Sequence, residues 1–233
     1  ASGLGIVFGG ALAEAGAHVI LADIVVGMKK DDGTLVEQAA LDEVAKSADG
    51  TKVQAINCNV TDQDSVQAMV DQVVKEYGKL DIIVNSAGLF GDLLRVSEMT
   101  PGNWDKVLAV DPKGTMLCSG AAAKVMREQG FGKIVNIASA SSFKAINGMS
   151  AYSAAKAGVV MLTKTIAVEN ARSNVQANVL SPGYFITPLN KDFFESEGGE
   201  KMMKQWPGRR CGELEELRGV IIYLCSEASN FTN

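Results

Sequence analysis

SGLGIVFGGALAEAGAHVILAD, residues 2–23, is the stretch of this chain that decides its fold. It begins in a turn with Gly3 and Gly5, continues into an alanine-rich helical run and ends in a short apolar strand that stops at Asp23. Glycine allows both a tight turn and close backbone packing. A glycine turn, a helix and a buried strand in this order predict a doubly wound α/β domain.

Short apolar runs recur along the chain, each bounded by Gly, Asn, Asp or Ser. They lie at residues 17–22, 52–57, 80–85, 132–138 and 174–180. Helical patterns lie between them, at residues 62–77, 101–129 and 150–172. Apolar strands of this kind are typical of a parallel sheet that is covered on both faces. We therefore expect an α/β fold with a doubly wound parallel sheet, a Rossmann-type three-layer arrangement in a single domain over residues 1–233.

The two ends of the sequence lack strands that such a sheet needs. No strand precedes the turn at Gly3, and the chain stops at Asn233, just after a helical run. We expect that the first and last strands are missing because the sequence is trimmed. A natural variant without its first strand is the alternative, and it is disfavoured because that strand is central to the sheet.

Residues 187–212 contain Pro, Gly and charged residues and few strand signals. This pattern predicts a loop with a short helix, and a loop of this length at a ligand site is typical of a lid over a substrate.

The composition excludes several classes of protein. The 233 residues carry a net charge of −5 without a long basic cluster, so nucleic-acid binding is not expected. The apolar stretches are far shorter than a membrane span. Cys58, Cys118, Cys211 and Cys225 are scattered, which is typical of reduced thiols in the cytoplasm. His18 is the single histidine, and no residues group as metal ligands, so no metal is expected.

The glycine turn and Asp23 together predict a dinucleotide site. Gly3 and Gly5 would be the last two glycines of a G-x-x-x-G-x-G turn, which sets helix N–H groups against a pyrophosphate. A carboxylate at Asp23 can accept hydrogen bonds from both hydroxyls of an adenosine ribose, and it repels a 2′-phosphate. Because neither Ser2 nor Ile24 offers a positive charge, NAD is expected rather than NADP.

Tyr152 and Lys156 have the spacing of a proton-transfer pair. They are four residues apart in a helical segment, which places both side chains on one face. A nearby ammonium favours the phenolate and lowers the pKa of a tyrosine toward the range of acid–base catalysis. Ser139 follows a predicted strand, at the sheet edge where α/β proteins bind ligands, and its hydroxyl can hold a carbonyl oxygen beside the tyrosine.

The order and spacing of these pieces resemble the short-chain dehydrogenase/reductase family over nearly the whole chain. The matching pieces are SGLG at 2–5, Asp23, Asn85-Ser86-Ala87-Gly88, Ser139, YSAAK at 152–156, and Pro182-Gly183 with Thr187. The resemblance implies that Tyr152 exchanges a proton with the substrate oxygen. It also implies that Lys156 holds the nicotinamide ribose and that Ser139 polarises the substrate carbonyl.

The same resemblance implies a set of cofactor contacts. They fall at Ser2, Gly3, Leu4, Gly5 and Asp23 for the pyrophosphate and ribose, at Asn59 and Val60 beside the adenine, at Asn85, Ala87 and Gly88 for the central sheet and the adenine ribose, at Tyr152 and Lys156, and at Pro182, Gly183, Phe185 and Thr187 for the carboxamide. The family often has Asp where Asn59 stands.

One position departs from the family pattern. The family's fourth catalytic residue is usually an asparagine, and here Asp111 stands in its place, followed by Pro112. The proline predicts a helix kink that leaves the Asp111 carbonyl free for a water molecule. Because a carboxylate near Lys156 would disturb proton equilibria, we expect weakened rather than abolished catalysis, with Asp111 still part of the catalytic set.

These features predict an NAD-dependent oxidoreductase that transfers a hydride between the nicotinamide and a secondary alcohol or ketone. A Ser-His-Asp hydrolase is set aside because residues 148–152, GMSAY, lack the final glycine of a nucleophile elbow. A catalytically weakened dinucleotide-binding sensor or interaction protein is the alternative.

The substrate and the assembly are predicted only in outline. Residues 182–189 and 229–231 are similar to gluconate 5-dehydrogenase-like members of the family, which suggests small polyols or sugar acids. The helical stretches 101–129 and 150–172 carry alanine-rich faces, and in the family the matching helices form a dimer interface. A homodimer or homotetramer is therefore expected; the alternative is that these faces belong to the core.

Overall fold

The first helix begins directly after the glycine turn. The structure, a computed structural model, describes residues 3–30, 34–186 and 190–233. Helix α1 (Leu4–Glu14) follows Gly3, whose φ of 52° lies in the left-handed region that glycine adopts without strain. The helix leads into β1 (Val19–Asp23), so the predicted turn, helix and strand follow one another as expected.

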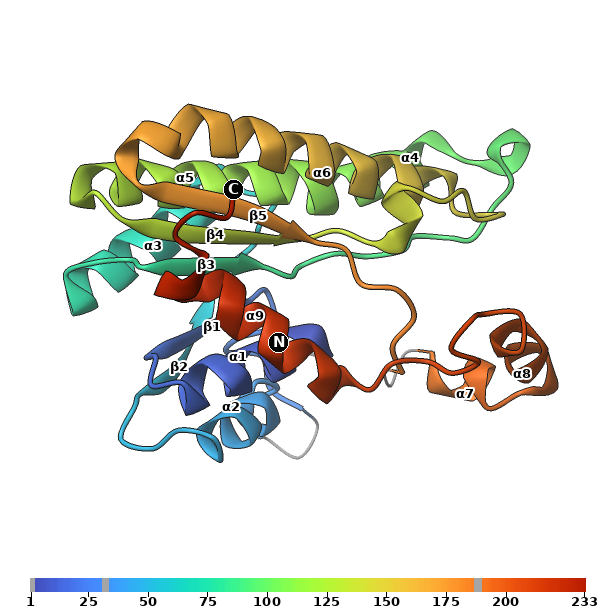
Figure 1. Cartoon of the computed structure of the whole chain (residues 1–233), viewed down its shortest axis with the longest axis horizontal. Helices are drawn as coiled ribbons and strands as arrows, with labels where there is room; N and C mark the ends of the chain where they lie inside the picture. Colours follow the sequence, from blue (N-terminus) through green and yellow to red (C-terminus); the bar gives the residue numbers. More distant parts are fainter. Residues whose placement is uncertain (1–2, 31–33, 187–189) are drawn as a thin grey trace.

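Strands and helices alternate along the rest of the chain (Figure 1). In order, they are α2 (Gln38–Ala45), β2 (Val53–Asn57), α3 (Gln63–Tyr77), β3 (Ile82–Asn85), α4 (Pro101–Leu108), α5 (Gly114–Gln129), β4 (Gly132–Ile137), α6 (Ser150–Asn170), β5 (Val175–Leu180), α7 (Lys191–Phe194), α8 (Glu197–Met203) and α9 (Arg218–Cys225). Each predicted strand forms within two residues of its expected bounds. The predicted α/β fold is confirmed.

The strands pair in parallel and, in the described residues, form two sheets. One sheet is β1–β2, with Val19 opposite Val53, and the other is β3–β4–β5. Strand β4 is central in the larger sheet, and all of its residues are buried. Strands β1 and β3 do not pair with each other. The expectation that strands are missing at the two ends of the sequence stays a prediction.

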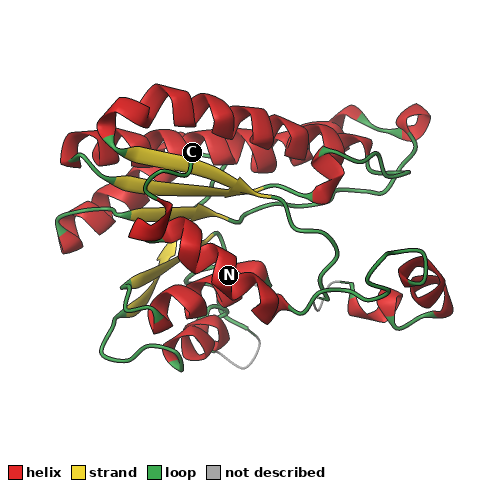
Figure 2. Ribbon diagram, viewed as in Figure 1, coloured by secondary structure: helices red, strands yellow, loops and turns green. Residues whose placement is uncertain are grey.

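Helices cover both faces of the larger sheet (Figure 2). On one face, α5 and α6 pack together against β4 and β5. Their shared core includes Ala122, Met126, Ile134, Ile166 and Val175. This packing fixes α6, which carries the tyrosine and the lysine singled out in the sequence, beside the strand that precedes Ser139.

Helix α1 contacts both sheets. With α9, it covers the second face of the larger sheet, where Phe8 packs with Val135 and Ile221. Its residue Ala13 packs with Leu21 of β1. A helix that is apolar on all sides is typical of such a buried position. Helix α1 therefore joins the two sheets through side-chain packing.

The long helical stretch expected at 101–129 is kinked at Pro112. Helices α4 and α5 are separated by a π-helical turn at Ala109–Lys113, which contains the proline. Proline lacks an N–H and cannot continue the α-helical hydrogen bonds, so the predicted kink is confirmed. The backbone carbonyl of Asp111 accepts the N–H of Gly114, which the Ala109 carbonyl also accepts. A carbonyl oxygen has a second lone pair, so the water expected at Asp111 stays a prediction.

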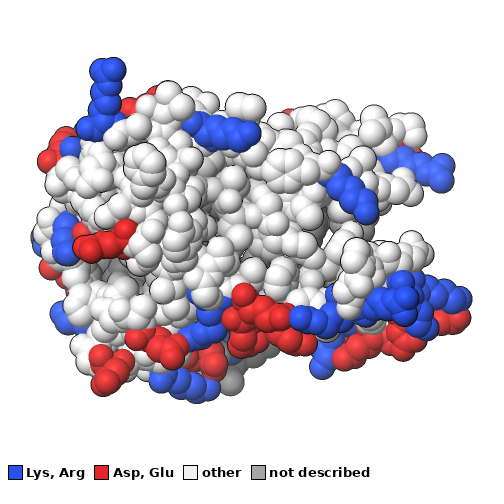
Figure 3. Space-filling model, in the orientation of Figure 1, with Lys and Arg blue, Asp and Glu red and all other residues white. Residues whose placement is uncertain are grey.

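Residues 184–186 and 190–212 form a small lobe with the short helices α7 and α8 (Figure 1). The Tyr184 ring stacks on Trp206 at a centroid distance of 4.6 Å, and Phe194 packs against both rings. Figure 3 shows a mixed-charge lobe that a notch separates from the upper part of the molecule on this face. The loop expected at 187–212 thus contains two helices rather than one; residues 187–189 lie outside the described residues.

Three findings bear on the expectations from composition. Cys58, Cys118, Cys211 and Cys225 are all buried and free. Within the described residues, no group of three or more His, Cys, Asp or Glu side chains could hold a metal ion. None of the helices in this part of the chain has both the length and the apolar character needed to cross a membrane.

Candidate active site

The Lys156 ammonium is buried where α6 meets the carboxyl end of β4. Only 4% of the residue is exposed. Its Nζ donates a hydrogen bond to the carbonyl of Ile137 at 3.0 Å and lies 3.3 Å from Oδ2 of Asp111. Burial lowers the pKa of Lys156, and the charge of Asp111 opposes that shift. The lysine is therefore held by one backbone carbonyl and one carboxylate.

Asp111 is fully buried in the π-helical turn. Its Oδ1 accepts the N–H of Leu89 at 3.0 Å, while Oδ2 has the Lys156 ammonium and no hydrogen-bond donor in the described residues. Burial raises the pKa of Asp111, and Lys156 opposes the rise. The carboxylate thus joins the loop after β3 to α6.

Tyr152 lies one helical turn before Lys156, as predicted. The Lys156 Nζ is 5.7 Å from the centre of the Tyr152 ring. Burial raises the pKa of Tyr152 to about 12; the nearby Asp111 charge adds to this rise, and a hydrogen bond with Ser139 opposes it. The pKa of Tyr152 is therefore raised in this state, where the sequence predicted a lowering by Lys156, and burial is the main cause.

Ser139 follows β4 at the edge of the sheet, as expected. It caps the short helix Ala140–Ser142, and its Oγ accepts the N–H of Ser141 at 3.1 Å. Since its hydroxyl also acts on the Tyr152 pKa through a hydrogen bond, the two side chains are neighbours. Strand β4 and helix α6 therefore bring together Ser139, Tyr152 and Lys156, and the turn before α5 adds Asp111.

Asn85 belongs to a buried polar network between the sheet and its helices. Its Nδ2 donates to Asn136 Oδ1 at 2.8 Å and to Ser119 Oγ at 2.9 Å. Asn136 in turn donates to Thr163 of α6 at 2.9 Å. Buried polar groups of this kind need all their partners. The network joins β3, β4, α5 and α6, which supports the sheet-stabilising role expected for Asn85.

Ala87 and Gly88 follow Asn85 and are exposed. A Cβ atom on Gly88 would lie 2.9 Å from Lys156 Nζ and 3.2 Å from Asp111 Oδ1. The backbone of the loop therefore passes close to the ion pair only because this residue has no side chain.

The residues expected to bind the adenosine end lie at the carboxyl ends of β1 and β2. Asp23 ends β1, and its Oδ1 accepts the N–H of Val25 at 3.2 Å. Asn59 accepts hydrogen bonds from the backbone and the hydroxyl of Thr61, and the neighbouring Val60 packs against Gly114. The first turn of α1, with Leu4 and Gly5, follows Gly3.

The segment after β5 connects the sheet to the lobe. The Pro182 carbonyl accepts the N–H of Ala140 at 2.9 Å, which ties this segment to the residue after Ser139. Gly183 is exposed, and Phe185 bridges to Gly212. Two residues of the expected cofactor set, Ser2 and Thr187, lie outside the described residues.

Phe90 and the backbone groups that hold the ion pair were not predicted from the sequence. The Phe90 ring packs on Tyr152 at a centroid distance of 4.5 Å, although Phe90 is 41% exposed. The Leu89 N–H and the Ile137 carbonyl hold Asp111 and Lys156. In the sequence, Phe90 was marked only by its place in the apolar pair Leu89-Phe90 after Gly88. The backbone contacts do not depend on residue type, so the sequence gives no indication of them.

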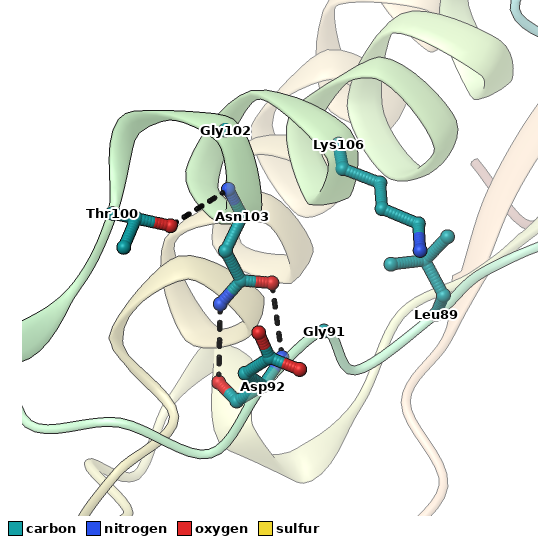
Figure 4. Close-up of a pocket in the computed structure, with 7 residues that line it drawn as sticks. All are labelled: Leu89, Gly91, Asp92, Thr100, Gly102, Asn103 and Lys106. Atoms are coloured by element: carbon teal, nitrogen blue, oxygen red, sulfur yellow. Dashed lines mark hydrogen bonds between the residues drawn. The ribbon is translucent and has the colours of Figure 1, made fainter.

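A shallow pocket lies beside the same loop (Figure 4). It has a volume of about 460 Å³ and is lined by Leu89, Gly91, Asp92, Thr100, Gly102, Asn103 and Lys106. The Asn103 amide ties the loop to α4, since it accepts the Asp92 N–H at 2.9 Å and donates to the Asp92 carbonyl at 3.3 Å. Asp92 and Lys106 give the pocket one charge of each sign.

Comparisons with known proteins match the whole chain. A sequence model of the family described as enoyl-(acyl carrier protein) reductase matches residues 1–233. The chain is 35% identical over 233 residues to 3-oxoacyl-[acyl-carrier-protein] reductase of Thermotoga maritima, covering 99% of this chain and 89% of the relative. It is 33% identical over 234 residues to 5-keto-D-gluconate 5-reductase of Escherichia coli K12, covering 100% and 88%.

Solved structures share the fold. Levodione reductase superposes with a TM-score of 0.90 at 30% identity, covering 100% of this chain and 90% of that one. NAD+-bound xylitol dehydrogenase gives a TM-score of 0.87 at 27% identity, covering 99% and 90%. Gluconate 5-dehydrogenase from Burkholderia cenocepacia, in complex with NADP and tartrate, gives 0.86 at 32% identity, covering 99% and 87%.

Replacing the buried lysine should destabilise the protein in a pH-dependent way. Lys156→Met leaves the buried Asp111 carboxylate without its counter-charge, which should cost about 3–5 kcal/mol of unfolding free energy at neutral pH. Protonation makes Asp111 neutral, and its pKa is already raised by burial. The loss should therefore shrink as pH falls through that raised pKa.

Urea denaturation of both proteins at neutral and mildly acidic pH measures this effect. Lys124→Met, at an exposed position of α5, is the matched control and should change stability little. A Lys156→Met loss equal to that of the control, or independent of pH, would show that the pair does not carry the charge balance described.

Proposed function

Since the chain belongs to the short-chain dehydrogenase/reductase family, whose oxidoreductases act on alcohol or ketone substrates with NAD(P), we propose that it transfers a hydride between NAD and a secondary alcohol or ketone, with Tyr152 as the general acid and base. The observation that carries this proposal is the convergence of Ser139, Tyr152 and Lys156 at the carboxyl end of β4. Ligands of open α/β sheets bind at this edge.

The three side chains have complementary roles in the proposed reaction. In the reducing direction, the Tyr152 hydroxyl donates its proton to the carbonyl oxygen of the substrate, and in the oxidising direction its phenolate takes the proton of the alcohol. Ser139 lies beside Tyr152 and orients the same oxygen. The bound nicotinamide supplies or accepts the hydride. Lys156 holds the nicotinamide ribose with its remaining N–H, since two of its three donors face Asp111 and Ile137.

The residues described fit a dinucleotide across the carboxyl edge of the strands. Helix α1 presents its free N–H groups directly after Gly3, which suits a pyrophosphate. Gly88 keeps the backbone beside Lys156 open, because a Cβ there would collide with the ammonium. Asn59 and Val60 would flank the adenine, and Pro182, Gly183 and Phe185 would border the carboxamide, with Ser2 and Thr187 completing the two ends of the cofactor site.

NAD is the proposed cofactor. Asp23 ends β1 and is partly buried, and a carboxylate at this position can accept hydrogen bonds from ribose hydroxyls and is unfavourable for a 2′-phosphate. Relatives of this chain are found with either cofactor: the Listeria innocua relative is named an NAD-dependent glycerol dehydrogenase, and the Burkholderia structure holds NADP. The proposal of NAD therefore rests on Asp23.

The proposed substrates are small polyols, sugar acids or the matching ketones. The names of several relatives support this class: 5-keto-D-gluconate 5-reductase, NAD-dependent glycerol dehydrogenase and D-threitol dehydrogenase. The lid predicted from the sequence at 187–212 belongs to the lobe that contains α7 and α8, and we propose that it covers the substrate. The lobe is joined to β5 through the exposed Gly183 and contacts the core of the larger sheet through Phe185, so the proposed motion is one of its outer helices α7 and α8.

The protein is also proposed to act as a homodimer or homotetramer in the cytoplasm. Exposed apolar residues on neighbouring helices support a shared interface: Met116 of α5 is 45% exposed, and Met161 and Val168 of α6 are 62% and 81% exposed. Met161 and Val168 are seven residues apart, which places both on one face of α6. Four buried free cysteines suit a reducing compartment.

Replacing the proposed acid–base group should abolish most turnover. Tyr152→Phe removes the hydroxyl and keeps the ring, so NADH binding should persist while kcat falls by on the order of 10²–10⁴-fold. The measurement follows NADH absorbance with a panel of polyols, sugar acids and their ketones. Tyr223→Phe, at a position of α9 that is 42% exposed, is the matched control. Equal turnover in Tyr152→Phe refutes the role, and wild-type cofactor binding without turnover of any substrate favours the sensor.

The cofactor preference should depend on Asp23. The wild-type protein should have a higher kcat/KM with NAD than with NADP, and Asp23→Ser should narrow this ratio by on the order of tenfold, because a repulsive charge beside the 2′-phosphate is removed. Asp49→Ser, at an exposed position before β2, should leave the ratio unchanged. A wild-type preference for NADP would contradict the assignment.

A charge on the exposed face of α6 should weaken the assembly. Val168→Glu should shift the mass measured by light scattering toward the monomer, because the carboxylate would be buried at the interface. Val96→Glu, at a residue that is 75% exposed outside α5 and α6, should keep the wild-type mass. A wild-type monomer at micromolar concentration would remove the proposal.

A further inference from the structure

A carboxylate at position 111 makes two contacts that an amide at the same place cannot make together. Asp111 Oδ1 accepts the Leu89 N–H, and Oδ2 faces the Lys156 ammonium at 3.3 Å. An asparagine has one acceptor oxygen and one NH2 group. If its oxygen accepted the Leu89 N–H, its NH2 group would face the ammonium, and two donors would oppose each other.

We propose that Asp111 is a positioning residue that holds the Lys156 ammonium beside Gly88 and pairs its charge, so that proton loss from Tyr152 is suppressed in the resting protein. The inference rests on the proposed function, because it assigns Asp111 a role in controlling the proposed acid–base group. It goes beyond that function because it makes the ease with which Tyr152 loses its proton depend on the ion pair of Asp111 and Lys156.

The described groups around the Asp111–Lys156 ion pair are uncharged, so Asp111 is the counter-charge of the lysine. Lys156 comes from α6, Asp111 from the π-helical turn, and the two uncharged contacts are the Ile137 carbonyl of β4 and the Leu89 N–H of the loop. Among the described residues, Asp111 is the charged group that acts on both Lys156 and Tyr152. Carboxylate and ammonium together are neutral, so Tyr152 does not face an unpaired positive charge.

The charge of Asp111 determines the direction in which it shifts the pKa of Tyr152. A negative charge near a phenol disfavours the phenolate, and the Tyr152 pKa is raised to about 12 with Asp111 among the causes. Alcohol oxidation needs the phenolate, which takes the hydroxyl proton of the alcohol while the hydride moves from the carbon that bears this hydroxyl to the nicotinamide. Carbonyl reduction needs the neutral phenol. Alcohol oxidation should therefore rise with pH over the whole stable range, while carbonyl reduction should not need alkaline conditions.

Asp111→Asn tests the proposal. Removing the negative charge should lower the Tyr152 pKa by about one unit or more. The alkaline limb of kcat/KM for alcohol oxidation should then bend toward a plateau at correspondingly lower pH. Asp105→Asn, a charge-matched change at an exposed position of α4, should keep the wild-type pH profile. An Asp111→Asn profile that superposes on the wild type overturns the proposal.

A second measurement does not depend on turnover. The protein has four tyrosines, so ring-carbon NMR of 13C-labelled tyrosine, with Tyr152→Phe to identify the signal, follows the ionisation of Tyr152 directly. The Tyr152 signal should begin to titrate at lower pH in Asp111→Asn than in wild type. Asp111→Ser, which is smaller and avoids the clash of donors, should behave in the same way if Asp111→Asn folds poorly.

The two arms separate the proposal from the function on which it rests. An unchanged Tyr152 titration in both variants overturns the role of Asp111 even if the enzyme is active. Wild-type protein that oxidises no alcohol, while its Tyr152 titration still shifts in the variants, overturns the proposed function and leaves the charge relation intact.

Discussion

The burial of one ammonium group constrains the whole site. Lys156 Nζ lies inside the protein, and a buried charge is tolerated only with a counter-charge and hydrogen-bond acceptors. Its acceptor comes from the last residue of β4 and its counter-charge from the π-helical turn before α5. That carboxylate in turn holds the loop after β3. A single side chain of α6 thus fixes three segments that are far apart in the sequence.

The rest of the fold keeps that geometry rigid. The Asn85–Asn136–Thr163 chain of hydrogen bonds joins β3, β4 and α6 below the ion pair, and a buried network of this kind fails if one partner moves. Apolar packing of α5 and α6 on β4 and β5 supplies the remaining support. The described residues of the lobe take no part in this hydrogen-bond chain or in the α5–α6 core, and Phe185 packs instead on the other face of the larger sheet. The proposed proton-transfer end of the site is therefore supported by different contacts from those of the lobe.

The sequence predicts the parts of this arrangement that depend on local pattern. Apolar runs located every strand, Pro112 located the kink, and the spacing of Tyr152 and Lys156 placed both on one helix. It could not predict contacts made across the fold. The Ile137 carbonyl and the Leu89 N–H are backbone groups, so the identity of these residues does not reveal their contacts. Phe90 contacts Tyr152 only because the loop after β3 folds back toward α6. The Tyr152 pKa was predicted in the wrong direction because its value depends on burial and on where the lysine points.

Residue 111 illustrates why family membership does not determine proton energetics. Asparagine and aspartate have nearly the same shape, so the π-helical turn and the position of α6 can be the same with either. Their effects on a buried lysine differ, since a carboxylate offers two acceptors and a charge, whereas an amide offers one acceptor and a donor. In a low-dielectric site, that difference acts on every titratable neighbour. The fold and the set of side chains can therefore be inherited unchanged while the charge beside Lys156 differs, and that charge adds to the rise that burial causes in the pKa of Tyr152.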